Sequence, residues 1–183
     1  MRQPEGIPAR RILIVGGCGA GKSMFAVKLA AVTGLPLVHL DREFWQPGWV
    51  TLPSDAWRDK VGALVAPDRW ILEGNYGSSL DLRLPRADGV IWFDYPWPIC
   101  LVRAIRRSVR GYGRVRADMA PGCPERIDLE FYHYVATFNR HHRPIIVDAL
   151  ARHGAHLTPV IFHNDGDAAR FLADLPASAA DRD

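Results

Sequence analysis

The chain lacks any long run of apolar residues, although 48 % of its 183 residues are hydrophobic. No stretch approaches the roughly 20 apolar residues that a membrane-spanning helix needs. The N-terminus also lacks the apolar segment that is typical of secretory signal peptides. We therefore expect a cytoplasmic protein with no membrane partner. The length and a charged fraction of 23 % suit one globular domain, residues 1–183, with a full core.

Cysteine is scarce, and the three that occur lie far apart in the sequence: Cys18, Cys100 and Cys123. None has the spacing that is typical of zinc ligands, and the seven histidines are scattered as well. An odd number of cysteines in a cytoplasmic protein favours free thiols over disulfides. The composition therefore argues against a disulfide-stabilised scaffold and against a zinc-binding domain.

Lysine is also scarce, because only 3 of the 23 basic residues are lysines and 20 are arginines. Seven of the arginines fall within residues 103–126, which contain two acidic residues. Arginine binds phosphate oxygens in a bidentate manner that lysine cannot match. Residues 111–126 are rich in glycine and proline and predict a mobile lid, with Arg107 and Arg114 binding ATP phosphates. The alternative for this arginine run is a solvated helix face.

Residues 16–23 match the phosphate-binding loop pattern G-x-x-x-x-G-K-[ST]. Glycines let backbone amides curl around a polyphosphate, and the helix that follows directs its N-terminus at the same anion. In this pattern the lysine reaches the β- and γ-phosphates, and the hydroxyl residue ligates Mg²⁺. The sequence therefore predicts a site for ATP and Mg²⁺ formed by Gly16, Gly17, Cys18, Gly19, Ala20, Gly21, Lys22 and Ser23.

The apolar runs predict a three-layer α/β/α fold with a five-stranded parallel sheet. Strands are expected at residues 12–15, 35–40, 70–73, 89–94 and 156–162. Helices are expected at residues 24–32, 54–65, 98–110, 125–140, 144–153 and 165–175, and a frayed tail at residues 177–183. In the helix at 98–110 the spacing predicts that Leu101, Ile105 and Val109 face the core. Strands that alternate with helices in this way form a parallel sheet covered on both faces.

Polar side chains follow three of these strands, at the edge where ligands bind in such folds. Asp41 is a candidate to accept the proton of a substrate hydroxyl, because aromatic residues and no helix are expected to follow it. Glu73 and Asp94 are candidates to anchor metal-bound water, Glu73 together with Ser23. Asn75 follows Glu73 in a turn. The tryptophans at 45 and 49 lie among Gln, Pro and Gly, which favours a substrate-facing loop over core packing.

Several segments resemble the bacterial topology modulation proteins, a group of small P-loop proteins similar to adenylate kinase and to other nucleoside or nucleotide kinases. The segments are Leu40-Asp41, Trp45, Pro47-Gly48-Trp49, residues 73–76, residues 81–88 and residues 116–126. This resemblance implies a nucleotide-kinase-like P-loop NTPase fold and transfer of a phosphoryl group from ATP to a nucleotide or nucleoside.

The resemblance also suggests roles for individual residues. Catalytic roles fall to Lys22, Asp41, Arg107 and, after the lid, Arg140. Acceptor binding falls to Asp41, Trp45, Trp49, Glu73, Asn75 and Arg83. Arg83 would supply a cation that adenylate kinases carry in the segment matched by residues 73–75, and Arg143 is a second arginine of the transition-state type.

The family name leaves a second function open, a nucleotide-dependent regulator or slow ATPase that affects DNA topology indirectly. The sequence shows no helix-turn-helix, zinc finger or long basic arm. We therefore expect ATP and a small-molecule acceptor as partners, no direct binding of nucleic acid, and a monomer or weak homodimer.

Overall fold

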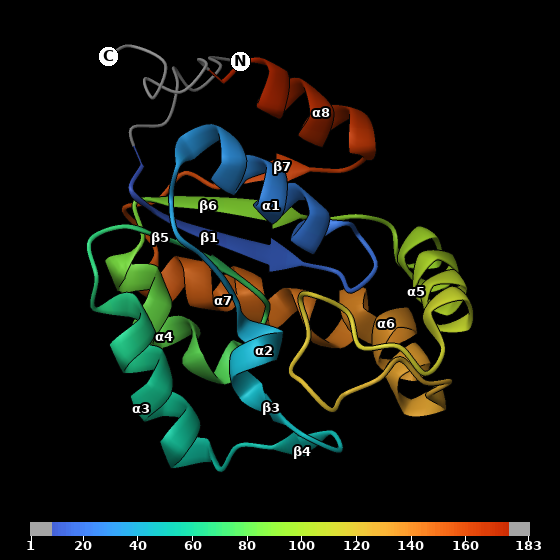
Figure 1. Cartoon of the computed structure of the whole chain (residues 1–183). Helices are drawn as coiled ribbons and strands as arrows, with labels where there is room; N and C mark the ends of the chain where they lie inside the picture. The colour runs from blue at the N-terminus through green and yellow to red at the C-terminus, as the bar shows by residue number, and fades with distance from the viewer. Residues whose placement is uncertain (1–8, 176–183) are drawn as a thin grey trace.

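The computed structural model describes residues 9–175, and its centre is a five-stranded parallel sheet (Figure 1). The strands lie in the order β2-β5-β1-β6-β7. They are β1 (Arg11–Gly16), β2 (Leu37–His39), β5 (Trp70–Glu73), β6 (Gly89–Phe93) and β7 (Val160–Phe162). Every neighbouring pair is parallel, which confirms the predicted sheet. The central strand, β1, leads directly into the phosphate-binding loop pattern.

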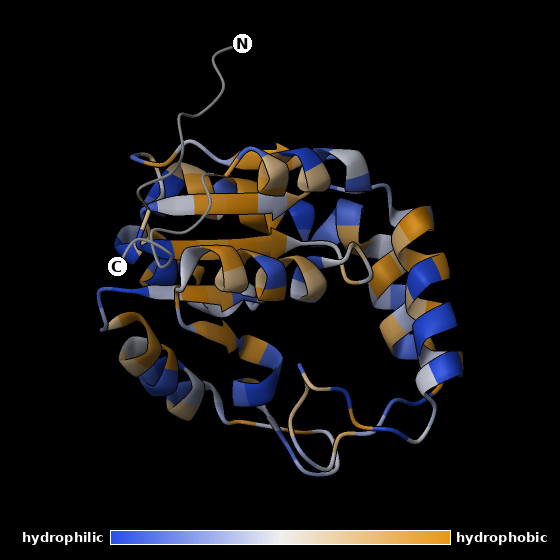
Figure 2. Cartoon of the chain, turned by 45° about the horizontal axis from the view of Figure 1, so that its top comes forward, coloured by the Kyte–Doolittle hydropathy of each residue, from blue (hydrophilic) through white to orange (hydrophobic). Residues whose placement is uncertain are grey.

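Helices cover both faces of the sheet because successive side chains of each buried strand point to opposite faces. From β1, Ile12 and Ile14 pack toward α1 (Lys22–Thr33) and α8 (Asp165–Ala173). Leu13 and Val15 belong to the other core cluster. That cluster includes residues of α3 (Ser54–Val65), α4 (Leu80–Arg83) and α7 (Arg143–His153). Figure 1 shows the two helical layers, and Figure 2 shows that the strands between them are strongly hydrophobic.

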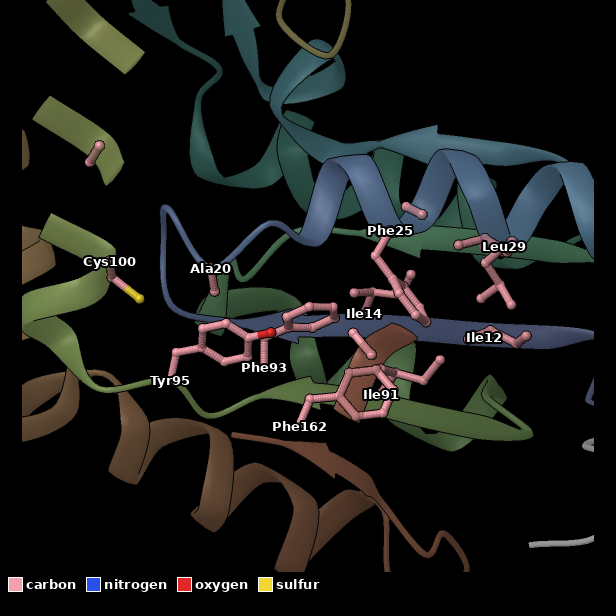
Figure 3. Packing of buried hydrophobic residues seen from close by; sticks show 14 of the residues in the cluster. Ile12, Ile14, Ala20, Phe25, Leu29, Ile91, Phe93, Tyr95, Cys100 and Phe162 are labelled. Carbon is pink, nitrogen blue, oxygen red and sulfur yellow. The ribbon is translucent and has the colours of Figure 1, made fainter. Parts of the chain in front are cut away.

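Phe25 of α1 lies at the centre of the first cluster (Figure 3). Its ring centroid is 5.3 Å from those of both Phe93 and Phe162, in edge-to-face arrangements. It also lies 6.0 Å from the ring of Phe171 in α8. One aromatic side chain therefore joins the helix that follows the phosphate-binding loop to two strands and a second helix.

Two further helices stand beyond the carboxyl ends of the strands and pack against each other, α5 (Trp97–Gly111) and α6 (Leu129–His141). Residues 112–128, called the lid segment below, connect them. The remaining short elements are α2 (Leu40–Phe44), β3 (Trp45–Gln46), β4 (Val50–Thr51) and the 3₁₀ turns η1 (Gly77–Ser79) and η2 (Leu84–Arg86). β3 and β4 form a small antiparallel hairpin.

The structure corrects several predicted boundaries. The last strand covers only the second half of the predicted range, and α6 begins four residues later than predicted. There the carboxylate of Asp128 accepts a hydrogen bond from the amide of Phe131 at 3.0 Å and caps the helix. A short helix, α2, follows β2 and contains Asp41, so the expectation that no helix follows this residue is wrong. The predicted tail, residues 177–183, lies outside the described residues.

The predicted inward face of α5 is wrong for two of its three residues, since only Leu101 packs against the core. Ile105 and Val109 are 40 % and 60 % exposed, whereas Cys100, Ala104 and Ser108 are buried. The physical reason is that the buried face of α5 packs against α6 and, at Cys100, against Gly17 and Gly19 of the phosphate-binding loop. Among the helices of the described part of the chain, none combines the length and apolar character that a membrane crossing requires.

The position of Phe25 generates a stability prediction. Phe25→Ala removes a buried ring from the meeting point of α1, β6 and β7, so we expect a loss of about 3–5 kcal/mol in the free energy of unfolding. Val27→Ala on the same helix is the matched control, because Val27 is 54 % exposed, and its effect should stay within about 0.5 kcal/mol. Urea unfolding of both variants measures the difference. Equal losses would contradict the central role of Phe25.

Candidate phosphate-binding and acceptor site

The loop between β1 and α1 has a backbone path that only glycine permits at two points. Gly16 has φ +130° and Gly19 has φ +89°, values that other residues rarely adopt. A Cβ at Gly16 would overlap the backbone of Phe93, and a Cβ at Gly19 would overlap the carbonyl of Cys100. The glycines of the motif therefore let the loop lie directly on β6 and α5.

The loop leaves a set of backbone amides without internal partners. Gly17 donates to the carbonyl of Phe93 and Ala20 to that of Gly17, each at 3.2 Å. Within residues 9–175, no backbone carbonyl accepts a hydrogen bond from the remaining amides at the start of α1, those of Cys18, Gly19, Gly21, Lys22 and Ser23. All five residues line a cavity of about 1620 Å³. A cluster of free amides at a helix N-terminus is the arrangement that binds phosphate.

Lys22 lies within this loop and is only 7 % exposed. Its ammonium group donates to the carbonyl of Gly17 at 3.0 Å, so its charge is held beside the free amides. The thiol of Cys18 also lines the cavity, and burial raises its pKa. Cys18 is therefore a neutral, weakly reactive thiol, which suits a variable position of the loop.

Ser23 shares its surroundings with the buried carboxylate of Glu73 at the end of β5. The hydroxyl of Ser23 donates to Oε2 of Glu73 at 3.1 Å, and Nδ1 of His39 lies 2.9 Å from the same oxygen. Asp118 approaches Ser23 from the lid segment. Burial opposes the ionisation of Asp118, but the charge of Arg116 and the hydroxyl of Ser23 outweigh it and lower the pKa of this carboxyl.

These oxygen atoms fit Mg²⁺, which prefers carboxylate and hydroxyl oxygens and takes many of its ligands from water and substrate phosphates. Among residues 9–175 there is no cluster of three or more His, Cys, Asp or Glu side chains that could form a protein-only metal site. Ser23 and Glu73 are therefore suited to hold Mg²⁺ together with phosphate oxygens. Both were predicted as metal ligands from the sequence.

Asp41 lies in α2 and faces the same cavity. Its Oδ1 accepts a hydrogen bond from the hydroxyl of Tyr76 at 2.6 Å. Its position in α2 does not make it a cap, because His39 holds the N-cap position and no side chain caps the helix. Burial raises the pKa of Asp41, and the nearby charge of Glu73 adds to this, against the opposing effects of Tyr76 and Lys22. A carboxylate with a raised pKa inside a cavity is typical of general bases.

Trp45 and Trp49 form an aromatic wall of the cavity. Their ring centroids are 5.4 Å apart in an edge-to-face arrangement. Nε1 of Trp49 donates to the carbonyl of Pro124 in the lid segment at 3.1 Å, and the guanidinium of Arg126 lies 5.0 Å from the Trp49 ring. Both tryptophans therefore line the cavity, and their predicted contact with a substrate stays a prediction.

The lid segment rests on the β3–β4 hairpin. The amide of Gly48 donates to the carbonyl of Gly122 at 2.9 Å, and the thiol of Cys123 lies 3.1 Å from the carbonyl of Gln46. Three buried lid residues pack against the two tryptophans and form a third core cluster, Met119, Ala120 and Cys123. The lid segment thus closes one side of the cavity instead of extending into solvent.

Glu125 holds one arginine of α5 and one of the lid segment. It is only 6 % exposed, and its Oε1 lies 3.1 Å from Nε of Arg107 and 2.6 Å from Nε of Arg116. Its other oxygen accepts a hydrogen bond from Ser108 at 3.0 Å. The guanidinium of Arg107 also lies 5.5 Å from the ring of Phe131. One buried carboxylate therefore holds two arginines at the cavity wall.

Four predicted arginines are not in the cavity wall: Arg83, Arg114, Arg140 and Arg143. Arg114 and Arg140 are exposed and do not line the cavity, so their positions do not support contact with ATP. Arg83 is fully buried, and its guanidinium donates to backbone carbonyls, including that of Gly74 at 3.0 Å. Arg83 therefore cannot be the acceptor-binding cation, since its donors are used inside the protein.

Two further predicted residues have structural partners. The side chain of Asn75 lines the cavity, but its amide is bonded to Gly16 on both sides, with Oδ1 and Nδ2 each at 2.8 Å from the Gly16 backbone. Asp94 forms a bidentate ion pair with Arg143, with contacts of 2.9 Å. Because both side chains are used in this pair, the structure does not support the predicted water-anchoring role of Asp94 or the predicted transition-state role of Arg143.

The sequence did not identify four residues that contribute to the site: His39, Tyr76, Asp118 and Glu125. His39 precedes Asp41 by two positions at the end of β2, and this proximity was an available signal. The other three depend on contacts between residues that lie 17 to 95 positions apart in the chain. Ser108 and Glu125 have the shortest of these separations, and Ser23 and Asp118 the longest. No local pattern encodes such contacts.

Two solved structures have a fold similar to that of this chain. A shikimate kinase from Bacteroides thetaiotaomicron matches with a TM-score of 0.51 and 14 % identity, over 90 % of this chain and 95 % of that chain. A shikimate kinase from Acinetobacter baumannii in complex with shikimate matches with a TM-score of 0.57 and 17 % identity, over 91 % of this chain and 90 % of that chain. At these identities the likeness establishes the fold alone.

No protein-family model matches the chain, and no curated protein sequence does. The resemblance to topology modulation proteins therefore stays a prediction. The predicted α/β fold with a five-stranded parallel sheet is confirmed.

The raised pKa of Asp41 generates a prediction about the stability of the protein. The folded state binds the Asp41 proton more tightly than the unfolded state, so the carboxylate lowers the stability as pH rises through its folded pKa. Asp41→Asn removes this charge and should raise the melting temperature at pH 8. The gain should vanish below about pH 3.9, where the carboxyl is protonated in both states. Thermal unfolding at several pH values tests this, and a variant that is less stable at pH 8 would contradict it.

Proposed function

We propose that this chain is a kinase that transfers the γ-phosphoryl group of ATP to a hydroxyl group of a small molecule. The acceptor oxygen forms a bond to the γ-phosphorus, the bond from this phosphorus to the β–γ bridging oxygen breaks, and ADP leaves. The carboxylate of Asp41 takes the hydroxyl proton. The observation that supports this proposal most directly is that one cavity contains both the free amides of the phosphate-binding loop and Asp41.

The other residues of the cavity divide the remaining work. The loop amides and Lys22 bind and orient the phosphates, which is the main contribution a protein makes to phosphoryl transfer. Ser23 and Glu73 would hold Mg²⁺, which when bound neutralises charge on the phosphate oxygens. Arg107 and Arg116, held by Glu125, offer guanidinium groups at the lid side of the cavity. The lid segment excludes water from the reacting groups.

We infer further that the acceptor is a neutral alcohol with a flat or apolar surface, of which a nucleoside is one example. Beside Asp41 the cavity is walled by apolar and aromatic side chains, those of Phe44, Trp45, Trp49 and Met119. Aromatic walls of this kind favour a planar ring. The hydroxyl would lie at Asp41 and the ring against the tryptophans.

The charge pairing of the cavity arginines supports a neutral acceptor over a nucleotide or a carboxylate. Arg42 donates to the carbonyl of Ala117 at 3.3 Å. The other arginines that line the cavity are paired with carboxylates: Arg103 with Asp165, Arg107 and Arg116 with Glu125, and Arg126 with Asp128. An anionic acceptor that bound one of these four paired arginines would have to compete with a carboxylate, whereas a neutral alcohol would not. Only Arg42 lacks a carboxylate partner among the cavity arginines of residues 9–175.

Replacing Lys22 tests the phosphate-binding part of the proposal. Lys22→Ala removes a charge-assisted contact worth about 1.5–3 kcal/mol, so calorimetry should show Mg·ATP binding weakened by roughly 10- to 100-fold. Lys60→Ala is the matched control, because Lys60 pairs with Glu43 at 2.7 Å and lies outside the cavity. Wild-type protein that binds no Mg·ATP would overturn the proposal, and equal affinity of the two variants would remove Lys22 from it.

An acceptor screen tests the reaction and the acceptor class together. ADP release is measured with matched pairs that differ by one anionic group: nucleosides against their 5′-monophosphates, and methyl shikimate against shikimate. We expect turnover with neutral members, and a loss of at least about 100-fold in Asp41→Asn. Faster turnover of the anionic members would overturn the neutral-acceptor inference while leaving the kinase proposal intact. Mg·ATP binding without phosphorylation of any acceptor would contradict the kinase proposal.

A further inference from the structure

We propose that the buried Arg83 is a positioning residue, which sets the placement of Asp41 relative to the phosphate-binding loop through the turn at residues 74–79. The inference rests on the proposed function for its catalytic meaning, but its structural content can be tested without any turnover. Arg83 itself does not line the cavity. It therefore acts through Asn75 and Tyr76, the two members of the turn whose side chains reach the site.

Arg83 is an unusual buried cation. It is 0 % exposed, and within residues 9–175 it forms no ion pair with a carboxylate. Burial lowers its pKa to about 9, which still leaves the guanidinium charged at neutral pH. Its hydrogen bonds go to four backbone carbonyls of the turn, those of Gly74, Asn75, Tyr76 and Ser79. The planar fork of donors that arginine offers is what allows one side chain to hold so many carbonyls.

The turn that Arg83 holds contains backbone strain. Tyr76 has φ +40°, a left-handed value that costs free energy for a residue with a Cβ. Its carbonyl accepts hydrogen bonds from Nη2 of Arg83 at 2.9 Å and from the amide and hydroxyl of Ser79, both at 3.0 Å. These donors keep Tyr76 in a conformation that the chain would otherwise leave.

The turn directs the side chains of Asn75 and Tyr76 to opposite parts of the site. Asn75 clasps the backbone of Gly16, the first residue of the phosphate-binding loop, with two hydrogen bonds of 2.8 Å. Tyr76 donates to Asp41 at 2.6 Å. Because the two residues are adjacent, one rigid turn connects the donor loop and the proposed base.

The ring of Tyr76 is fixed as firmly as its backbone. Its centroid lies 4.6 Å from that of Phe44 and 4.9 Å from that of Trp57. A tyrosine hydroxyl has a single proton, and here it is used on Oδ1 of Asp41. The second oxygen of Asp41 therefore remains for the acceptor hydroxyl. A loosened turn would release this arrangement and also the tie to Gly16.

The test follows the titration of the Asp41 carboxyl by ¹³C NMR, assigned with Asp41→Asn, in wild type and two variants. Tyr76→Phe removes the hydrogen bond that favours the ionised form, so the Asp41 midpoint should move to higher pH. Arg83→Lys retains the charge but not the fork, so we expect the same upward move. It should also weaken Mg·ATP binding by roughly fivefold through the loosened Asn75 contact.

Arg86→Lys is the matched control, because Arg86 holds the carbonyls of Val65 and Ala66 at 3.2 and 3.0 Å outside the cavity. It should leave the Asp41 midpoint unchanged. If Arg83→Lys does not fold, Ser79→Ala loosens the same Tyr76 carbonyl and should give a smaller upward move. An unchanged midpoint in folded Arg83→Lys, or in Ser79→Ala where that substitutes for it, would overturn the proposal. Because the NMR arm needs no substrate, that result differs from a failure of the kinase assays.

Discussion

The site depends on a row of backbone amides that face the cavity and form no internal hydrogen bonds. Because few bonds within the loop between β1 and α1 fix its shape, neighbouring elements must hold it. Three neighbours do this. The carbonyl of Phe93 accepts a hydrogen bond from Gly17, Asn75 forms two hydrogen bonds with Gly16, and Cys100 of α5 lies against the loop. Each lies far from the loop in sequence. The free amides are thus a product of the whole sheet edge, although the motif that predicts them is eight residues long.

The cationic side chains around the cavity are also held by other parts of the protein. Most of them already pair with carboxylates or donate to backbone carbonyls when no ligand is bound. Glu125 holds Arg107 of α5 and Arg116 of the lid segment, and Arg83 holds the turn that carries Asn75 and Tyr76. Side chains fixed in this way lose little freedom when a ligand binds, which is the condition for precise orientation of reacting groups. Asp41 differs from these cations, because burial makes its charged form unfavourable. A destabilised negative charge is what a proton acceptor requires.

Sequence reasoning succeeded where the signal was local. The apolar runs identified all five strands of the sheet, and the contiguous motif identified the loop and the placement of Lys22 and Ser23 in the cavity. It failed where burial depends on partners distant in the chain. The exposed face of α5 was misassigned because α6 and the loop, and not the apolar pattern, decide which side of this helix is covered. Arg83 was misassigned because its sequence position suggests a ligand cation, whereas its hydrogen bonds show a structural one. The five-residue helix α2 is too short for a periodic pattern to reveal it.

The cluster that joins the lid segment to the β3–β4 hairpin has a consequence for the rate of turnover. Met119, Ala120 and Cys123 pack against Trp45 and Trp49 and belong to neither of the two cores that flank the sheet. This small contact can separate while both large cores remain intact, so the free energy of opening is far below that of global unfolding. In the proposed kinase, departure of the product would require this contact and the hydrogen bonds from Gly48 and Trp49 to break. Substitutions at the two tryptophans would then change the rate of product release without altering the groups that perform the chemistry.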